Sequence, residues 1–348
     1  MGISISVGCE DRMRKIEYCI IGGGVAGLAA ANRLADLGMQ PCVIEAGDYP
    51  KDRVCGEFLS PEILPTLSHW DIHPSRKIQT VKFFGPEGAQ FEFKLDSPAG
   101  SMTHVDLEMK LLQRAKKKNV TILTNTRVLE VIPLSDQESS FEIQLSEDER
   151  IQVDQLLITV GSGLNQSKPK AVYYGKKAHY TAKEQTDTLQ MHIFPGGYLG
   201  ISPVTSSMIN VAMLSTSPQM IPGSLLDQFP DSQLQSPCLE CQLPQFGYRK
   251  FPNWKNVYFF GDAAMSIPPV TGDGVAMAIS SGVMAAECSV KSDSSGFCRK
   301  SRKMFQKRIL VGRILHHLLL NQYSAKVLFT LCSKFPGIAK FFYHRTRG

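Results

Sequence analysis

A glycine-rich hexapeptide near the start of the chain, GGGVAG at residues 22–27, constrains the fold more than any other feature of the sequence. It follows a short apolar run and precedes a helical pattern that extends to Leu37. The order strand, glycine turn, helix is what a dinucleotide pyrophosphate requires: Gly22 allows the tight turn, Gly24 lets the backbone approach the phosphates, and Gly27 lets helix and strand pack closely. The phosphates would then lie at the positive N-terminus of the helix. Because a motif this short also occurs as a plain turn, the rest of the sequence has to decide.

An acidic residue at the end of the next strand supports the nucleotide interpretation. The apolar stretch 41–46 is predicted to be a strand, and it contains Glu45, 18 residues after Gly27. A carboxylate in that position can accept hydrogen bonds from both hydroxyls of an adenosine ribose. It also disfavours a 2′-phosphorylated nucleotide, since two negative groups would meet.

Length and cysteine content bound the class of protein. A chain of 348 residues is long enough for two domains. Its nine cysteines are odd in number and scattered, which indicates a reducing compartment without a disulfide framework. Cys238 and Cys241 form a CxxC without a second ligand pair nearby, so no metal site is expected. Because no uncharged apolar run reaches the length needed to span a bilayer, we expect a cytoplasmic protein.

The positive charge is concentrated at the C-terminal end. Residues 299–348 contain 12 of the 38 lysines and arginines and no acidic residue. The basic residues alternate with aliphatic ones at roughly helical spacing in the segments 303–320 and 325–342, which favours an anionic lipid surface over nucleic acid. Two interpretations stay open: a helical cap packed on the rest of the protein, or an amphipathic element in peripheral contact with a membrane.

The order of the remaining patterns predicts an interrupted α/β fold. Residues 1–15 are polar and are expected to be disordered. Aromatic residues alternate on both sides of a Pro-Glu-Gly turn in 83–95, which predicts a hairpin. From 168 to 245 the chain changes to short strands with many prolines and glycines, typical of a separate, mostly β region. A strand at 257–260 and a helix from 275 to about 288, apolar nearly all round and therefore buried, return to the first fold.

A second motif, 240 residues after the first, follows that late strand: Gly261-Asp262, then Pro269, Gly272 and Gly274. With both motifs in this order, the chain resembles the p-hydroxybenzoate-hydroxylase-type FAD superfamily, and most closely its geranylgeranyl-reductase-like branch. The resemblance implies FAD as the cofactor, its ADP half held by the first motif and its ribityl and flavin half by the second. The residues that it implies for FAD binding are Gly22, Gly24, Val25, Ala26, Gly27, Glu45, Ala46, Arg53, Val128, Gly261, Asp262, Pro269, Gly272 and Gly274. It places Cys55, Phe194 and Tyr198 on the substrate side, and no catalytic residue is assigned.

The resemblance also implies the division of the chain. We expect a discontinuous Rossmann-like FAD-binding domain with a parallel sheet, a β-rich substrate domain, and a basic helical tail. In sequence numbers these are 14–75, 100–165 and 246–298 for the first, 76–99 and 166–245 for the second, and 299–348 for the third.

Departures from the superfamily pattern leave the reaction type open. Aromatic hydroxylases carry an Asp-Gly pair after the strand that here ends at Val160, whereas this chain has Gly161-Ser162-Gly163; His104 stands where relatives often have arginine; and the halogenase tryptophan and lysine motifs are absent. We expect a FAD-dependent oxidoreductase that reduces a carbon-carbon double bond of an isoprenoid-like or polyketide-like lipid. The alternatives are a monooxygenase acting on an aromatic or quinone-like compound and a non-catalytic flavoprotein partner. The electron donor, NAD(P)H or a redox protein, would have no Rossmann site of its own here.

Overall fold

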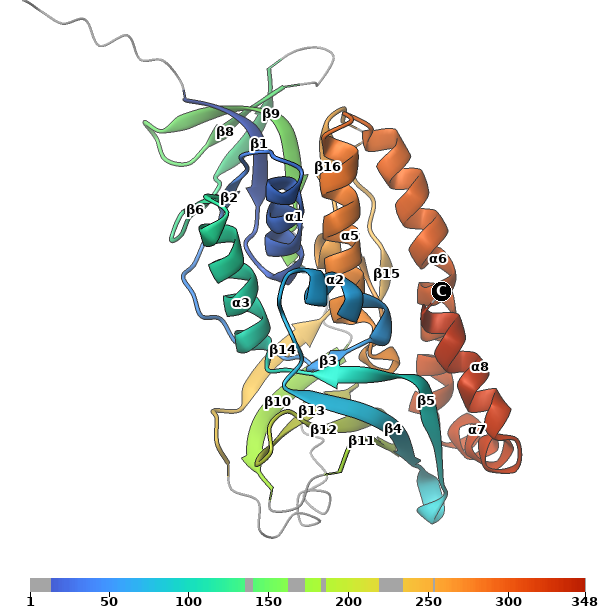
Figure 1. Ribbon diagram of the computed structural model, residues 1–348. Coiled ribbons are helices and arrows are strands. Elements are labelled where there is room, and N and C mark those ends of the chain that lie inside the picture. Colours follow the sequence, from blue (N-terminus) through green and yellow to red (C-terminus); the bar gives the residue numbers. More distant parts are fainter. Residues whose placement is uncertain are drawn as a thin grey trace, which may run out of the picture.

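The computed structural model describes residues 14–134, 140–161, 173–182, 186–218, 234–252 and 254–347. Two large sheets lie one beyond the other, and three C-terminal helices run along one side of both (Figure 1). Of the N-terminal arm expected to be disordered, residues 1–13 lie outside the described residues. The first strand begins earlier than predicted, at Arg14.

The first sheet has seven strands in the order β6-β2-β1-β9-β8-β7, with β16 also paired to β9. The pairs joining β6, β2, β1, β9 and β16 are parallel, and β7 and β8 continue the sheet antiparallel. The C-terminal parts of its central strands β1 and β9 are continuous apolar stretches, as expected where a parallel sheet is covered on both faces. The strands are β1 (Arg14–Ile21), β2 (Cys42–Ile44), β6 (Thr121–Leu123), β7 (Glu130–Pro133), β8 (Phe141–Gln144), β9 (Arg150–Ile158) and β16 (Val257–Phe259).

Three helices belong to this sheet: α1 (Val25–Asp36), α3 (His104–Lys117) and α5 (Gly274–Ser289). The side chain of Thr103 caps α3 by accepting a hydrogen bond from the backbone N–H of Asp106. Helices α1 and α5 approach closely at Gly282, because glycine has no side chain. A Cβ at this position would lie 2.4 Å from the carbonyl oxygen of Ala26. The predicted burial of α5 is confirmed, since most of its residues are inaccessible to solvent.

The second sheet has eight strands in the order β14-β10-β13-β12-β11-β4-β5-β3. The predicted hairpin is confirmed as β4 and β5, joined by the turn at η2 (Pro86–Gly88), and is longer than expected. Parallel pairing of β4 with β11 brings the early hairpin and the later β-rich segment into one sheet. The strands are β3 (Phe58–Leu59), β4 (Arg76–Phe84), β5 (Gln90–Ser101), β10 (Tyr173–Thr181), β11 (Thr188–Phe194), β12 (Gly197–Pro203), β13 (Met208–Ser215) and β14 (Leu239–Leu243).

Short elements connect these layers. They are η1 (Pro61–Ile63), α2 (Leu64–His69), η4 (Gly261–Ala263), η5 (Pro269–Thr271) and the two-stranded sheet of β15 (Gly247–Tyr248) and β17 (Met265–Ser266). Of these, η4, β17 and η5 carry or connect the residues of the second predicted motif. That motif is therefore a series of tight turns between β16 and α5.

The C-terminal segment forms α6 (Ser294–Leu320), α7 (Gln322–Lys334) and α8 (Pro336–Arg347). The predicted segment 325–342 is helical but consists of two helices, because the chain leaves helical geometry at Phe335, where Pro336 disfavours it in the residue before. Phe305 packs in the core of the first sheet, while Phe329 packs with the second. Along the described stretches of the chain, no helix combines the length and apolarity needed to cross a bilayer.

Candidate cofactor and substrate cavity

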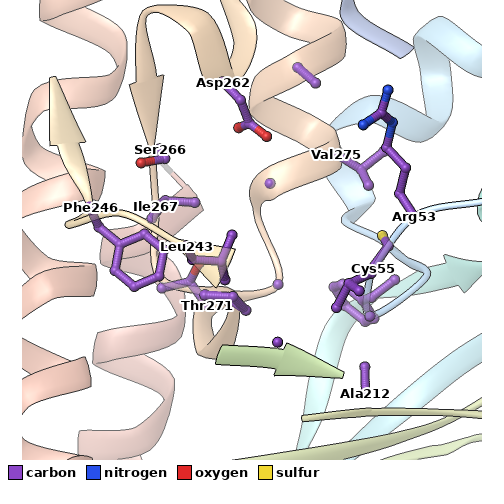
Figure 2. Close-up of a pocket in the computed structure, with 18 of the residues that line it drawn as sticks. Arg53, Cys55, Ala212, Leu243, Phe246, Asp262, Ser266, Ile267, Thr271 and Val275 are labelled. Carbon is purple, nitrogen blue, oxygen red and sulfur yellow. The ribbon is translucent and has the colours of Figure 1, made fainter. Parts of the chain in front are cut away.

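A cavity of about 970 Å³ lies between the two sheets and the C-terminal helices. It is lined by both glycine motifs, by strands of the second sheet and by residues of α6, α7 and α8. In Figure 2, Arg53 and Cys55 lie across the pocket from Asp262, Ser266 and Phe246. The topology therefore brings the two predicted motifs to one site.

The first motif divides into residues that face the cavity and one that supports the turn. Gly22 has a φ of +104°, and its N–H donates to the carbonyl of Ile44 at 2.9 Å. A Cβ on Gly24 would meet no atom of the described part of the chain within 4 Å, so this position opens onto the cavity, which Val25 and Ala26 also line. Gly27 does not line it: a Cβ there would lie 2.0 Å from the Gly22 carbonyl oxygen. The lack of a side chain therefore serves a different purpose at each of the three positions: a turn with positive φ at Gly22, open space at Gly24, and close packing against the turn at Gly27.

Glu45 lies directly after β2, beside the first motif, and lines the cavity together with Ala46 and Val128. Its carboxylate accepts hydrogen bonds from the N–H of Gly23 at 2.8 Å and of Gly47 at 3.0 Å, and it pairs with Lys51. Burial raises the pKa of Glu45, but the hydrogen bonds from Lys51, Gly47 and Gly23 outweigh burial and hold the pKa below its usual value. The group is therefore an ionised acceptor at the cavity wall. Its predicted contact with a ribose remains a prediction.

In the second motif, Asp262, Pro269, Gly272 and Gly274 line the cavity. Gly261 does not, because it packs against α1: a Cβ there would lie 2.9 Å from the Cβ of Ala26. The Asp262 side chain is exposed to the cavity; loss of bulk solvent in that enclosed position raises the pKa of its carboxyl, and Arg249 and Arg53 partly oppose this shift. Helix α5 begins at Gly274, so the positive end of its dipole is directed at the cavity.

A network of buried charges fixes the loop that carries Arg53 and Cys55. The fully buried ammonium of Lys177, from β10, binds Asp52 at 2.6 Å and Glu57 at 2.5 Å. Glu57 also bonds the ring of His179 at 2.8 Å and accepts from the backbone N–H of His104 at 2.8 Å. The loop is thus held rigidly against the second sheet, so the side chains that it presents to the cavity are preorganised.

His104 is a cavity residue that the sequence marked only as a departure from its relatives. It is buried, and neither ring nitrogen has a hydrogen-bond partner among the described residues. Burial, then Lys177 and Arg53, lowers the pKa of His104 to about 4, so the ring is neutral at pH 7. A neutral imidazole with an unused donor and an unused acceptor can bind a polar ligand group.

Of the three residues predicted on the substrate side, Cys55 and Tyr198 line the cavity, and Phe194 does not. Phe194 is the last residue of β11 and covers Gly197, where a Cβ would lie 2.4 Å from its ring. The Tyr198 hydroxyl accepts from the backbone N–H of Val270 and lies 3.3 Å from Nδ1 of His316. Burial raises the pKa of Tyr198 strongly, so that hydroxyl is a structural hydrogen-bonding group.

The rest of the cavity wall is apolar and comes mainly from elements whose role the sequence did not reveal. The helical and strand patterns were visible, but not which face meets which neighbour. Two strands of the hairpin and two C-terminal helices contribute most of it: Val81, Phe83, Phe91, Phe93, Leu315, Leu319, Leu328 and Phe329.

These features fit FAD. The backbone opens onto the cavity at several positions, since a Cβ on Gly24, Gly56, Gly161 or Gly274 would meet no atom of the described residues within 4 Å. The ring nitrogens of His104 and the carboxylate of Asp262 provide hydrogen-bonding groups in the wall of the same cavity. FAD is an extended ligand with polar groups along it, and one cavity joins both glycine motifs with polar groups in its wall.

Comparisons with known proteins agree. The family of NAD(P)-binding Rossmann-like domains matches residues 20–54. A digeranylgeranylglycerophospholipid reductase from Thermoplasma volcanium is 26% identical over 326 residues, covering 81% of this chain and 80% of that protein. Among solved structures, a geranylgeranyl bacteriochlorophyll reductase-like protein from Thermoplasma acidophilum has a TM-score of 0.74 at 18% identity, covering 96% of this chain and 100% of that one. A flavin-dependent brominase, Bmp2, has a TM-score of 0.77 at 16% identity, covering 95% and 93%. The predicted resemblance, fold class, FAD cofactor and FAD-dependent oxidoreductase class are confirmed.

Proposed function

From the fold and chemistry of a FAD-dependent oxidoreductase, we propose that this protein reduces a carbon-carbon double bond of a lipophilic, isoprenoid-like substrate. The observation that supports this most is the continuity of one cavity from the glycine motifs into an apolar section walled by aromatic and aliphatic side chains. An isoprenoid chain has no polar group to satisfy, and such a wall would bind it by burial of its surface. The similarity to a lipid reductase over four-fifths of the chain supports the same substrate class.

FAD, when bound, supplies the hydride. The protein binds the cofactor and the substrate, orients them relative to each other, and excludes water from the cavity. The residues of the two motifs would hold the ADP and flavin ends, and the N-terminus of α5 would stabilise negative charge near the second motif. Reduction of a double bond also consumes a proton. Cys55 is the cavity group best suited to supply it from Sγ, since burial and then Glu57 raise the pKa of its thiol to about 11 and keep it protonated. Water would return the proton to the thiolate.

The cofactor and the reaction type are tested together. We expect the purified protein, reconstituted with FAD, to show bound-flavin absorbance bands. After anaerobic reduction and incubation with a polyprenyl lipid, the product should gain two hydrogens. Protein without bound flavin would contradict the central proposal. Oxygen in the product after admission of air would instead support the monooxygenase, and turnover with no lipid would leave a flavoprotein partner.

Cys55 is tested by substitution. We expect Cys55→Ala to retain FAD and to lower turnover at least tenfold, because the proton would come from water. Cys241→Ala, on β14, is the matched control, since Cys241 does not line the cavity. An unchanged rate in the first variant would exclude Cys55 as the donor.

We further propose peripheral contact with an anionic membrane through the C-terminal helices. Tyr323, Val327 and Leu331 are exposed at successive turns of α7, among basic and uncharged side chains. Because other residues of α7 line the cavity, contact of this helix with a membrane would bring a lipid substrate close to its binding site. Replacing all three with serine should reduce sedimentation with phosphatidylglycerol vesicles, whereas Leu134→Ser with Val290→Ser, exposed elsewhere, should not. Equal sedimentation of all the proteins would contradict the contact.

A further inference from the structure

The guanidinium of Arg347, on α8, is bound in the wall of the cavity beside the second glycine motif. Its Nη2 donates to the carbonyl oxygen of Thr271 at 2.9 Å, and its Nε donates to Oγ of Ser60 at 3.0 Å. The same group lies 3.6 Å from the centre of the Tyr343 ring. A basic residue from the C-terminal segment is therefore anchored to the 269–274 loop, far from it in sequence.

The charge that accompanies Arg347 is arranged asymmetrically. Oδ1 of Asp273 lies 3.7 Å from Nε of Arg347 and accepts from the Ser60 hydroxyl at 3.3 Å. Asp273 is fully buried and does not line the cavity, whereas Arg347 does. The ion pair thus presents its cationic end to the cavity and keeps its anionic end behind the wall.

The position of the guanidinium indicates what it would face. A Cβ on Gly272, which has a φ of +70°, would lie 3.5 Å from Nη2 of Arg347. Gly272 and Gly274 line the same part of the cavity, where the second motif is expected to hold the flavin end of FAD. A flavin gains negative charge when it is reduced, so a fixed cation there would favour the reduced form.

Resting on the proposed FAD site, we propose that Arg347 is a positioning residue with two roles. It fixes α8 to the 269–274 loop, and it presents a permanent positive charge to the flavin end of the cofactor. The basic C-terminal segment then contributes to the chemistry of the cofactor as well as to the wall of the lipid cavity.

The charge is tested by the reduction potential of bound FAD in the whole protein. We expect Arg347→Gln to weaken the binding of reduced relative to oxidised FAD about tenfold, which for a two-electron couple is about 30 mV. Arg347→Lys, which keeps the charge, should stay within about threefold of the unmodified protein. Asp273→Asn, which removes the counter-charge, should shift the ratio in the opposite direction.

Arg345→Gln is the matched control: the side chain is exposed on the same helix, against Phe341, and its loss should leave the potential unchanged. The role of the charge would be overturned by an unchanged reduction potential in Arg347→Gln. It would also be overturned if Arg347→Lys weakened the binding of reduced relative to oxidised FAD tenfold. If Arg347→Gln does not retain FAD, the reduction potentials of Arg347→Lys and Asp273→Asn test the role of the charge.

The anchoring role is tested without cofactor. Urea unfolding of the cofactor-free protein should show a lower midpoint for Arg347→Gln than for Arg345→Gln. Equal midpoints would refute the anchor. Failure of the unmodified protein to bind FAD would refute the proposed function while leaving this comparison valid.

Discussion

At the scale of single residues, buried histidines and a buried aspartate make stability depend on pH in opposite senses. Burial lowers the pKa of His104, His192 and His316 to about 4, so the unfolded chain binds protons at a pH where the folded protein does not. The free energy of unfolding should therefore fall as the pH drops from about 6.5 towards 4. Burial raises the pKa of Asp273 to about 6, so its contribution falls as the pH rises from about 4 to 6.

His192 allows this to be measured away from the cavity. It stacks on Phe84 with ring centres 4.4 Å apart and does not line the cavity. His192→Gln cannot take up a proton, so we expect it to lose about 2 kcal/mol less than the unmodified protein between about pH 7 and about pH 5. Urea unfolding at the two pH values measures the difference. The same loss in both proteins would show that His192 titrates normally in the fold.

Two glycines of the first motif should respond differently to the same added methyl group. In Gly24→Ala the Cβ enters open cavity, so stability should stay within about 1 kcal/mol while FAD affinity falls at least about tenfold. In Gly27→Ala the Cβ meets the Gly22 carbonyl oxygen, and about 1–3 kcal/mol of stability should be lost. Thermal unfolding without cofactor and a flavin titration separate the two effects. Loss of stability in Gly24→Ala would show that this position is structural.

At the scale of secondary-structure elements, Phe329 on α7 joins the C-terminal helices to the second sheet. Its ring lies edge-on to Phe91 with centres 5.1 Å apart, and it covers Gly85, where a Cβ would lie 2.4 Å from the ring. Phe329→Ala should cost about 3–5 kcal/mol and raise KM for a long lipid more than for a short one. Tyr323→Ala, on the exposed side of the same helix, should change stability by less than about 0.5 kcal/mol. Similar stability and similar KM values in the two variants would mean that Phe329 does not hold α7 in the wall of the cavity.

The elements themselves were largely predictable, and the exceptions have local causes. Periodicity located α1, α5 and the 83–95 hairpin, because each has one buried face or is buried throughout. The break before Pro336 was missed because the apolar pattern continues across it, although the proline is itself a stop signal. The motif glycines were predictable for two reasons. Gly22 and Gly272 have positive φ values, which favour glycine, and a Cβ on Gly24 or Gly274 would occupy space expected for the ligand.

At the scale of the whole molecule, the residues that could not be predicted are those brought together only by packing. Helix α6 runs along one side of both sheets and leads into α7 and α8 (Figure 1). These last two helices place Phe329 and Arg347 in the cavity wall. Lys177 looks like a surface lysine in the sequence, yet it is fully buried between Asp52 and Glu57. No local pattern encodes a contact between residues 120 or more positions apart; only the sheet order and the helix docking create it.

The parallel pairing of β4 with β11, and the wall formed by α7 and α8, also bear on how the protein is made. The cavity draws on residues from Ile21 to Arg347, so a chain emerging from the ribosome cannot enclose a ligand until its C-terminal helices are free. The Rossmann-like unit would by then be exposed with its nucleotide cradle formed and its flavin end uncovered. Enclosure of the cofactor is therefore expected only after α7 and α8 have been synthesised, and FAD supply should influence how much of the newly made protein escapes proteolysis.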